Sequence, residues 1–353
     1  MPFKLAKFGA RVKIWHNVNG ESEGAELNKR RKLIIALGAS ALLAPFGSFA
    51  QQRKIWRIGI LKESKQSTDE SRLAALKGGL SALGYVEGAD YLIETRSAQS
   101  NFARLPELAA ELITLKVDVI VTSGTPSALA ASRITQHIPI VMPTVGDPVG
   151  SGLVDSLRHP GRNVTGLSTI TLELVGKRLE LLRQLLPQVR RVGLLYDPNN
   201  QIDAEVLKRF EADCARLKLH AIRAAAPSPD NISKAFVTLK QQRAQGLLVT
   251  SSGTNNSSQE YIIQQSAEHR LPTIYSRSDY GEAGGLISYS PDFTDMNRRA
   301  ATYIDKIFKG AKPGELPIEQ PAKFDFVLNM KTAKALGIKI PQLILVQATK
   351  VIE

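Results

Sequence analysis

Short apolar runs alternate along the chain with longer amphipathic segments, and one stretch shows the pattern most clearly. Val117–Val121 and Ile138–Met142 are apolar and rich in β-branched residues, which predicts two buried strands. The alanine-rich segment between them predicts a helix, with Thr125 as its N-cap and Pro126 at the first helical position. A strand, a helix and a strand in this order predict a parallel pair with a right-handed crossover.

The same pattern occurs a second time further along the chain. Residues 245–275 again give an apolar run, a turn of serine, glycine and threonine, a helix and another apolar run. Upstream of the two copies, Arg57–Leu61 is matched by Arg191–Leu195, and a loop and a long helix follow each. We interpret the copies as two α/β lobes of one design. The alternative is that the two segments look alike only because any two α/β units share this pattern.

The periodicity predicts that strands and helices alternate through both lobes. Further strands are expected at 55–61, 91–96, 191–196, 220–224, 247–250, 272–276 and 324–329. Helices are expected at 71–83, 105–116, 172–186, 202–217, 293–309 and 330–336. Extended segments at 163–168 and 284–289 are expected to cross between the lobes.

These crossings predict an α/β fold of two doubly wound, Rossmann-like lobes joined by a multi-strand hinge. Lobe 1 is expected to comprise residues 54–165 plus 290–321, and lobe 2 residues 166–289 plus 322–345. A chain that leaves one lobe, completes another and then returns has the connectivity of domains that close around a ligand.

The N-terminal region has the pattern of an export leader. Residues 1–26 show no clear periodicity and are expected to be an N-terminal extension. Residues 27–50 combine a basic cluster, the apolar run Leu33–Phe46 and small residues before Gln51, which predicts a signal peptide cleaved after Ala50. The apolar run is shorter than the ~20 residues of a membrane-spanning helix, although a membrane anchor is the alternative. We therefore expect a periplasmic protein, exported by the general or the twin-arginine route.

Composition narrows the chemistry. The formal net charge is +13, of which +5 lies in residues 1–50. The remaining charge is spread along the chain with no dense run of Lys and Arg and no interleaved aromatic residues, so we expect no nucleic-acid partner. Cys214 is the only cysteine and is expected to be a small buried residue, and the five histidines show no ligand spacing, so we expect no metal. The chain has no nucleophile elbow, phosphate loop or zinc-protease motif, so we expect neither an enzyme nor a cofactor.

Candidate ligand-binding residues follow the predicted strands, because open α/β sheets bind ligands at the carboxyl ends of their strands. They are Ser123, Gly124, Thr125, Gly146, Asp147, Ser168, Asp197, Ser251, Thr254, Asp279 and Tyr280. The turn at 123–125 opens a helix and suits an anion, unless it only caps that helix. The three aspartates suit an ammonium group, unless they only fix turns. Together these residues predict a ligand with a carboxylate and an amine.

Several segments resemble one known family. They are Arg57–Leu61, Pro139–Met142, Gly146–Val149, Asn163–Ser168 and Phe324–Pro341, of which the last is the most specific. With these residues the chain resembles the ABC-transporter substrate-binding proteins that include the binding proteins for tryptophan and other aromatic amino acids. The likeness spans about residues 54–345. It implies the type I periplasmic-binding-protein fold and delivery of a small solute to an ABC permease in the inner membrane.

The ligand class and two alternative functions stay open at this point. Aromatic residues make up 6% of the chain, and the turn at 251–256 is small and polar, which argues against an aromatic-lined pocket. An amino acid or a similar small molecule is therefore the expected ligand. The alternatives are a ligand-sensing partner of a membrane signalling protein and an exported enzyme on the same fold.

Overall fold

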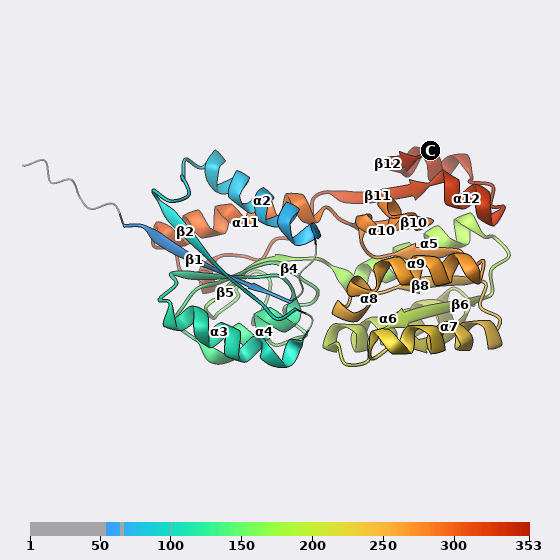
Figure 1. Cartoon of the computed structure of the whole chain (residues 1–353), viewed down its shortest axis with the longest axis horizontal. Helices are drawn as coiled ribbons and strands as arrows, with labels where there is room; N and C mark the ends of the chain where they lie inside the picture. The colour runs from blue at the N-terminus through green and yellow to red at the C-terminus, as the bar shows by residue number, and fades with distance from the viewer. Residues whose placement is uncertain (1–53, 64–66, 100) are drawn as a thin grey trace, which may run out of the picture. The chain divides into compact units, whose positions relative to one another are not determined.

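The computed structural model describes residues 54–63, 67–99 and 101–353 (Figure 1). The expected extension at 1–26, the signal peptide at 27–50 and its cleavage site lie outside these residues. The described chain forms two mainly parallel β-sheets with helices on both faces, which confirms the α/β class. In this part of the chain, none of the helices is both long and apolar enough to cross a lipid bilayer.

The first lobe contains a five-stranded sheet in which every neighbouring pair is parallel. In spatial order its strands are β2 (Tyr91–Ser97), β1 (Trp56–Lys62), β3 (Val119–Thr122), β4 (Ile140–Val145) and β5 (Val164–Ser168). The central strands are buried on both faces, which is why their sequences are continuous apolar runs rather than alternating patterns.

Two pairs of helices cover this sheet (Figure 1). They are α2 (Ser67–Ala82) with α11 (Phe293–Phe308), and α3 (Leu105–Thr114) with α4 (Thr125–Ile134). Val119 packs in the apolar cluster that α2 and α11 complete, whereas the next residue, Ile120, packs in the cluster of α3 and α4. Successive side chains of a strand point to opposite faces, so one strand supplies both clusters.

The second lobe contains a seven-stranded sheet. In spatial order its strands are β12 (Lys350–Ile352), β11 (Phe324–Asn329), β10 (Ile287–Pro291), β9 (Thr273–Tyr275), β8 (Gly246–Val249), β6 (Arg191–Tyr196) and β7 (His220–Ala225). Its neighbouring strands are parallel except for β10 and β11, which are antiparallel.

The helices of the second lobe contribute to two apolar clusters. One cluster includes residues of α5 (Thr171–Leu185), α6 (Gln201–Arg216), α12 (Met330–Leu336) and α13 (Gln342–Gln347). The other includes residues of α7 (Ile232–Gln241), α9 (Gln259–Glu268) and the short α10 (Ser278–Glu282). Cys214 is buried in the first cluster, as expected from the sequence.

The two lobes share one design. The strand order β2-β1-β3-β4-β5 of the first lobe corresponds to β7-β6-β8-β9-β10 of the second. In both, the strand order reverses on either side of the first strand, between β1 and β3 and between β6 and β8. The structure therefore confirms the repeat inferred from the sequence. It also provides two equivalent switch points, where α/β sheets bind ligands.

The crossings and ends differ in detail from the expected ones. By sheet membership the chain leaves the first lobe after Ser168, whereas the expected boundary is at 165. After Pro291, α11 packs in the first lobe, and β11 rejoins the second sheet at Phe324; the expected boundaries there are at 289 and 321. The N-cap of α4 is Gly124, and Thr125 is the first helical residue rather than the N-cap. Helix α13 and strand β12 were not expected, because segments of six and three residues show too little periodicity.

Candidate ligand-binding site

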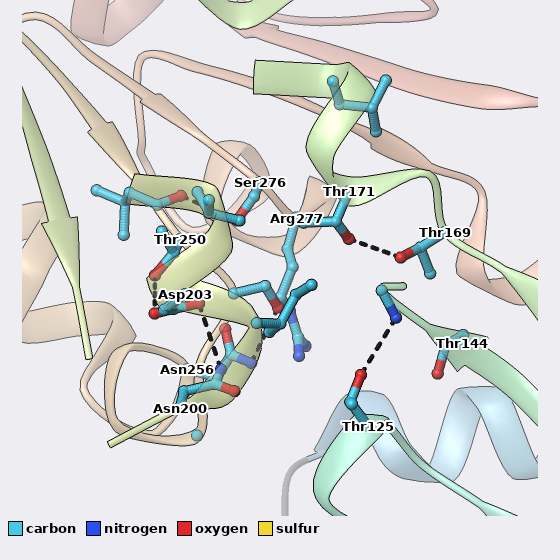
Figure 2. Close-up of a pocket in the computed structure, with 18 of the residues that line it drawn as sticks. Thr125, Thr144, Thr169, Thr171, Asn200, Asp203, Thr250, Asn256, Ser276 and Arg277 are labelled. Carbon is cyan, nitrogen blue, oxygen red and sulfur yellow. Dashed lines mark hydrogen bonds between the residues drawn. The ribbon is translucent and has the colours of Figure 1, made fainter. Parts of the chain in front are cut away.

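A pocket of about 120 Å³ lies at the carboxyl ends of strands of both sheets. Loops after β1, β3 and β4 line it from the first lobe, and loops after β6, β8 and β9 line it from the second. Figure 2 shows Asn200, Asp203 and Thr250 grouped across the pocket from Thr125 and Thr144. The strand-end rule applied to the sequence therefore led to this region.

The structure brings together only some of the predicted residues. Those that line the pocket are Ser123, Gly124, Thr125, Gly146 and Ser251. The predicted residues that do not line it are Asp147, Ser168, Asp197, Thr254, Asp279 and Tyr280. Within the first group, the hydroxyl of Thr125 accepts a hydrogen bond from the amide of Gly146 (3.2 Å), which joins the loops after β3 and β4.

The N-terminus of α4 is already occupied by a carboxylate of the chain. Glu63 Oε1 accepts hydrogen bonds from the Ser127 amide (3.0 Å) and hydroxyl (2.9 Å). Gly124 leaves room for this carboxylate, since a Cβ there would lie 2.7 Å from Glu63 Oε1. The chain itself therefore supplies the anion at this helix end, where the sequence predicted a ligand anion. The helix end has its stabilising negative charge, and a second carboxylate would be repelled.

Two of the predicted aspartates serve their own loops. Asp147 accepts a hydrogen bond from the Gly150 amide (2.8 Å), which closes a turn. Asp197 is buried, and it accepts hydrogen bonds from the Asn199 amide (2.9 Å) and from the hydroxyl of Thr254 (2.6 Å). These contacts hold the loops after β4 and β6 in shape. They correct the expectation that these carboxylates face the ligand.

The third aspartate and its neighbour are also engaged within the lobe. Asp279 binds Arg277 through two hydrogen bonds, of 2.6 Å from Nη2 and 3.1 Å from Nε. Tyr280 is buried against Tyr275 and donates its hydroxyl to the carbonyl of Asn255 (2.6 Å), and burial raises its pKa. Asp279 therefore positions the arginine that does line the pocket, and Tyr280 supports the loop after β8 (Gly253–Ser257, α8).

Ser168, the last residue of β5, is buried where the chain leaves the first lobe. Its hydroxyl accepts a hydrogen bond from the amide of Ile170 (3.4 Å). Ile170 adopts a left-handed backbone conformation (φ 47°) immediately before α5. Ser168 therefore supports the turn at the crossing rather than the ligand, which corrects the expectation that it faces the cleft.

Asp203 is a pocket residue that the sequence analysis missed. It lies in the first turn of α6 and is 1% exposed. Its carboxylate accepts hydrogen bonds from the Thr250 hydroxyl (2.6 Å), the Asp197 amide (2.9 Å) and the Asn200 carboxamide (3.3 Å). Burial raises its pKa to about 7, although the bonds from Thr250 and Asp197 oppose that rise. Its signal in the sequence is only that of an acidic first-turn residue.

Two carboxamides next to Asp203 and Ser251 add hydrogen-bond acceptors to the pocket wall. Asn200 donates its amide to Asp203, and Asn256 donates its amide to Ser251 (3.2 Å). The carboxamide oxygens of both asparagines are buried and have no hydrogen-bond partner among the described residues. A buried acceptor without a donor is costly, so this wall suits a ligand that donates hydrogen bonds.

Arg178 lines the pocket from α5 and was also missed. It is 6% exposed, and its Nε donates a hydrogen bond to the carbonyl of Tyr289 (2.9 Å). Among the described residues it forms no ion pair, and burial lowers its pKa to about 10. The sequence does contain a signal, because Arg178 stands at helical spacing among buried leucines and valines, where only apolar residues are expected.

Two glycines bring the lobes close together at the pocket. The ring of Phe102, from the 3₁₀ helix Phe102–Arg104, lies against Gly253 of the other lobe, where a Cβ would overlap it. Gly146 of the first lobe lies against Ile202 of the second, and a Cβ at Gly146 would be 2.8 Å from that side chain. Phe102, Phe293 and Ile202 supply apolar surface to the wall.

The pocket thus combines hydroxyls, carboxamides, charged groups and apolar side chains, which is the composition of a recognition site. Within the described residues, no group of three or more His, Cys, Asp or Glu side chains is placed to hold a metal ion. The site can hold a small polar molecule with an apolar part, and each lobe supplies some of the contacts.

Known proteins show the same fold. A conserved domain protein from Vibrio cholerae is 28% identical, with a TM-score of 0.80 over 84% of this chain and 100% of that protein. An ABC domain from Streptococcus pneumoniae in complex with L-Trp is 25% identical, with a TM-score of 0.79 over 85% of this chain and 100% of that one. More distant binding proteins for leucine and isoleucine share the architecture. The fold is therefore that of the type I periplasmic binding proteins, as predicted.

Sequence comparison leads to the family. The tyrosine-binding protein of Clostridioides difficile is 27% identical over 271 residues, which cover 75% of this chain and 77% of that protein. The sequence model of the family described as ABC transporter substrate binding protein matches residues 63–352. The match confirms the resemblance predicted from the strand and C-terminal motifs, and this chain belongs to the family of ABC transporter substrate-binding proteins.

Proposed function

We propose that the chain is the exported solute-binding component of an ABC importer. It captures an amino acid between its lobes and delivers it to a permease in the inner membrane. The observation that carries this proposal is the pocket at the carboxyl ends of both sheets, with buried groups that have no hydrogen-bond partner in the part of the chain that the structure describes. Such groups gain hydrogen bonds when a ligand enters, so the ligand stabilises the bound arrangement of the lobes.

The chemistry of the wall favours an amino acid over a sugar. Asp203 and the carboxamide oxygens of Asn200 and Asn256 accept hydrogen bonds and suit an ammonium group. Arg178 adds a cation to the same pocket. A ligand that carries both charges satisfies both sets of groups, whereas an uncharged sugar leaves the charges unpaired.

The apolar part of the wall accommodates a hydrophobic side chain. Phe102 and Phe293 supply aromatic rings, and Leu174 and Ile202 add aliphatic surface. The name of the C. difficile relative gives tyrosine as its ligand, and the S. pneumoniae protein was solved with L-Trp. Tyrosine and tryptophan are therefore the first ligands to test, followed by phenylalanine and leucine. The low aromatic content of the whole chain does not exclude them, because two rings at the pocket suffice.

Closure of the lobes links binding to delivery. Phe102 contacts Gly253, and Ile202 contacts Gly146, so residues of opposite lobes meet beside the pocket. A ligand that contacts both lobes favours this arrangement over one with the lobes apart. The permease can then distinguish the loaded protein from the empty one by shape.

Binding to a defined panel tests the proposal. The purified protein is screened by thermal unfolding and titration calorimetry with the L-amino acids, with glucose and ribose, and with the decarboxylated amine tyramine. We expect saturable binding of at least one L-amino acid and an increase in melting temperature that grows with its concentration. Binding of a sugar in preference to every amino acid, or no binding from the panel, would contradict the proposed ligand class.

A further inference from the structure

The guanidinium of Arg178 is a buried cation in the pocket for which the described protein supplies no carboxylate. Its one hydrogen bond runs from Nε to the Tyr289 carbonyl. That bond leaves the two Nη groups available, and a planar guanidinium presents them as a fork suited to a carboxylate. With a pKa of about 10 the group is protonated at neutral pH. A charge as deeply buried as this one is normally paired with an opposite charge. The ligand can therefore supply the anion that Arg178 does not find among the described residues.

The two other pocket arginines are engaged differently. Arg277 is held by the carboxylate of Asp279 through two hydrogen bonds. Arg72 lies over the ring of Phe293, with its guanidinium carbon 4.7 Å from the ring centroid. Arg277 therefore brings a compensating negative charge with it, whereas Arg178 does not. Among the pocket arginines, Arg178 is the one that is buried without a carboxylate partner in the described part of the chain, and it lies on the helix α5.

The other candidate site for a ligand anion, the N-terminus of α4 in the first lobe, is already occupied. Glu63 already occupies the N-terminus of α4, where its carboxylate accepts from both the amide and the hydroxyl of Ser127. A ligand carboxylate placed there would face a like charge. The negative end of a zwitterion is therefore directed away from Glu63 and toward the guanidinium in the second lobe.

We propose that Arg178 is a specificity-determining residue that binds the carboxylate of the ligand, with that carboxylate directed at α5 of the second lobe. This inference rests on the proposed function, and it moves the ligand carboxylate from the first-lobe turn at 123–125, where the sequence predicted it, to the second lobe. The ligand class it selects is a free α-amino acid, and amides, esters and decarboxylated amines are rejected.

A structural role for Arg178 gives a different expectation. The bond from Nε to Tyr289 joins α5 to β10, next to a crossing between the lobes. If this were the whole role, removing the side chain would lower stability, and an acid and its amide would be affected alike. The discriminating quantity is therefore the ratio of their dissociation constants, not the affinity for either one.

The test is a double-mutant cycle between Arg178 and the ligand carboxylate. Dissociation constants of L-tyrosine and L-tyrosinamide, and of L-tryptophan and L-tryptophanamide, are measured by calorimetry for the wild type and for Arg178→Met. We expect the wild type to prefer the acid about 10- to 100-fold, as for a charge-assisted hydrogen bond, and Arg178→Met to lose most of that preference. Arg183→Met, an exposed arginine of the same helix, is the matched control and should keep it.

Further variants keep the test decisive. Arg178→Lys retains the charge without the fork, and it should keep part of the preference if Arg178→Met does not fold. An unchanged acid-to-amide ratio in Arg178→Met, or loss of the ratio in Arg277→Met alone, would overturn the proposal while leaving the binding function intact. Absence of amino-acid binding in the wild type would instead overturn the proposed function.

Discussion

Lowering the pH from 8 to 5 should weaken amino-acid binding about 100-fold. Asp203 lines the pocket, and burial raises its pKa to about 7. A carboxyl group with that pKa is roughly 90% ionised at pH 8 and about 1% ionised at pH 5. If only the ionised form pairs with the ligand ammonium, the apparent dissociation constant rises in proportion to the lost fraction. No histidine is among the described residues that line the pocket, and of its carboxyl groups, Glu63 and Asp203, burial brings the pKa of Asp203 into this range.

The stability of the empty protein should change in the opposite direction over the same range. The folded-state pKa of Asp203 lies above its ordinary value of 3.8, so folding favours the protonated form. Its contribution is therefore fully present below the unfolded pKa near 3.8 and is lost as the pH rises through about 7. The difference between the two pKa values corresponds to about 4 kcal/mol of unfolding free energy in full, of which roughly 2–3 kcal/mol falls between pH 5 and 8. The ligand ammonium offsets this cost, so acid stabilises the empty fold and weakens binding.

Calorimetry at pH 5, 6, 7 and 8, with urea unfolding of the empty protein at the same values, checks both trends. Asp203→Asn removes the titrating group and should flatten the two profiles. Asp213→Asn is the matched control, because Asp213 is also buried on α6 but pairs with Arg209 away from the pocket. Dissociation constants that agree within twofold between pH 8 and pH 5 in the wild type would refute the assignment of Asp203 to the ammonium.

Three further predictions concern closure, capping and export. Gly253→Ala places a methyl group against the Phe102 ring and should weaken ligand binding several-fold, as measured by calorimetry. The control is Gly78→Ala, whose added methyl group meets nothing within 4 Å and should leave the affinity unchanged. Equal affinities of the two variants would contradict closure at this contact. Glu63→Ala leaves the α4 N-terminus without its acceptor and should lower the unfolding free energy by about 1 kcal/mol in urea titration; an unchanged midpoint would argue against the cap. The full chain expressed with its own leader should yield a protein that begins at Gln51; mass spectrometry that finds Leu33–Phe46 retained would exclude cleavage.

The fold was predictable because its sheets are buried on both faces. Val119, Ile120 and Val121 alternate between two apolar clusters, yet all three are apolar, so the strand is visible as an uninterrupted run. The repeat of that run further along the chain then indicated two lobes of one design. Short elements were missed for the opposite reason. Helix α10 spans five residues, which is too short to show a helical period, and its Tyr280 stacks on Tyr275 of β9.

The sequence prediction led to the loops that line the pocket but named only some of the side chains in its wall. The strand-end rule places whole loops, and it does not say which side chains of a loop are used by the loop itself. Asp147 and Asp197 follow strands as expected, but each accepts an amide of its own turn. The cap of α4 is Glu63, which lies 64 residues before its partner Ser127 in the sequence, so helix-capping rules that look at neighbouring residues could not find it.

Charges on helices are the better signal for this site. A polar residue in a loop often has only a structural role, because turns need side-chain hydrogen-bond acceptors and solvent is near. A charged residue within the apolar face of a helix has few, because burial of an unpaired charge is costly. Arg178 interrupts the buried face of α5, and Asp203 is buried at the start of α6, and both line the pocket. Opposite charges held on two helices that line one pocket can each be paired by a ligand that carries both charges, which is the physical argument behind the proposed zwitterion.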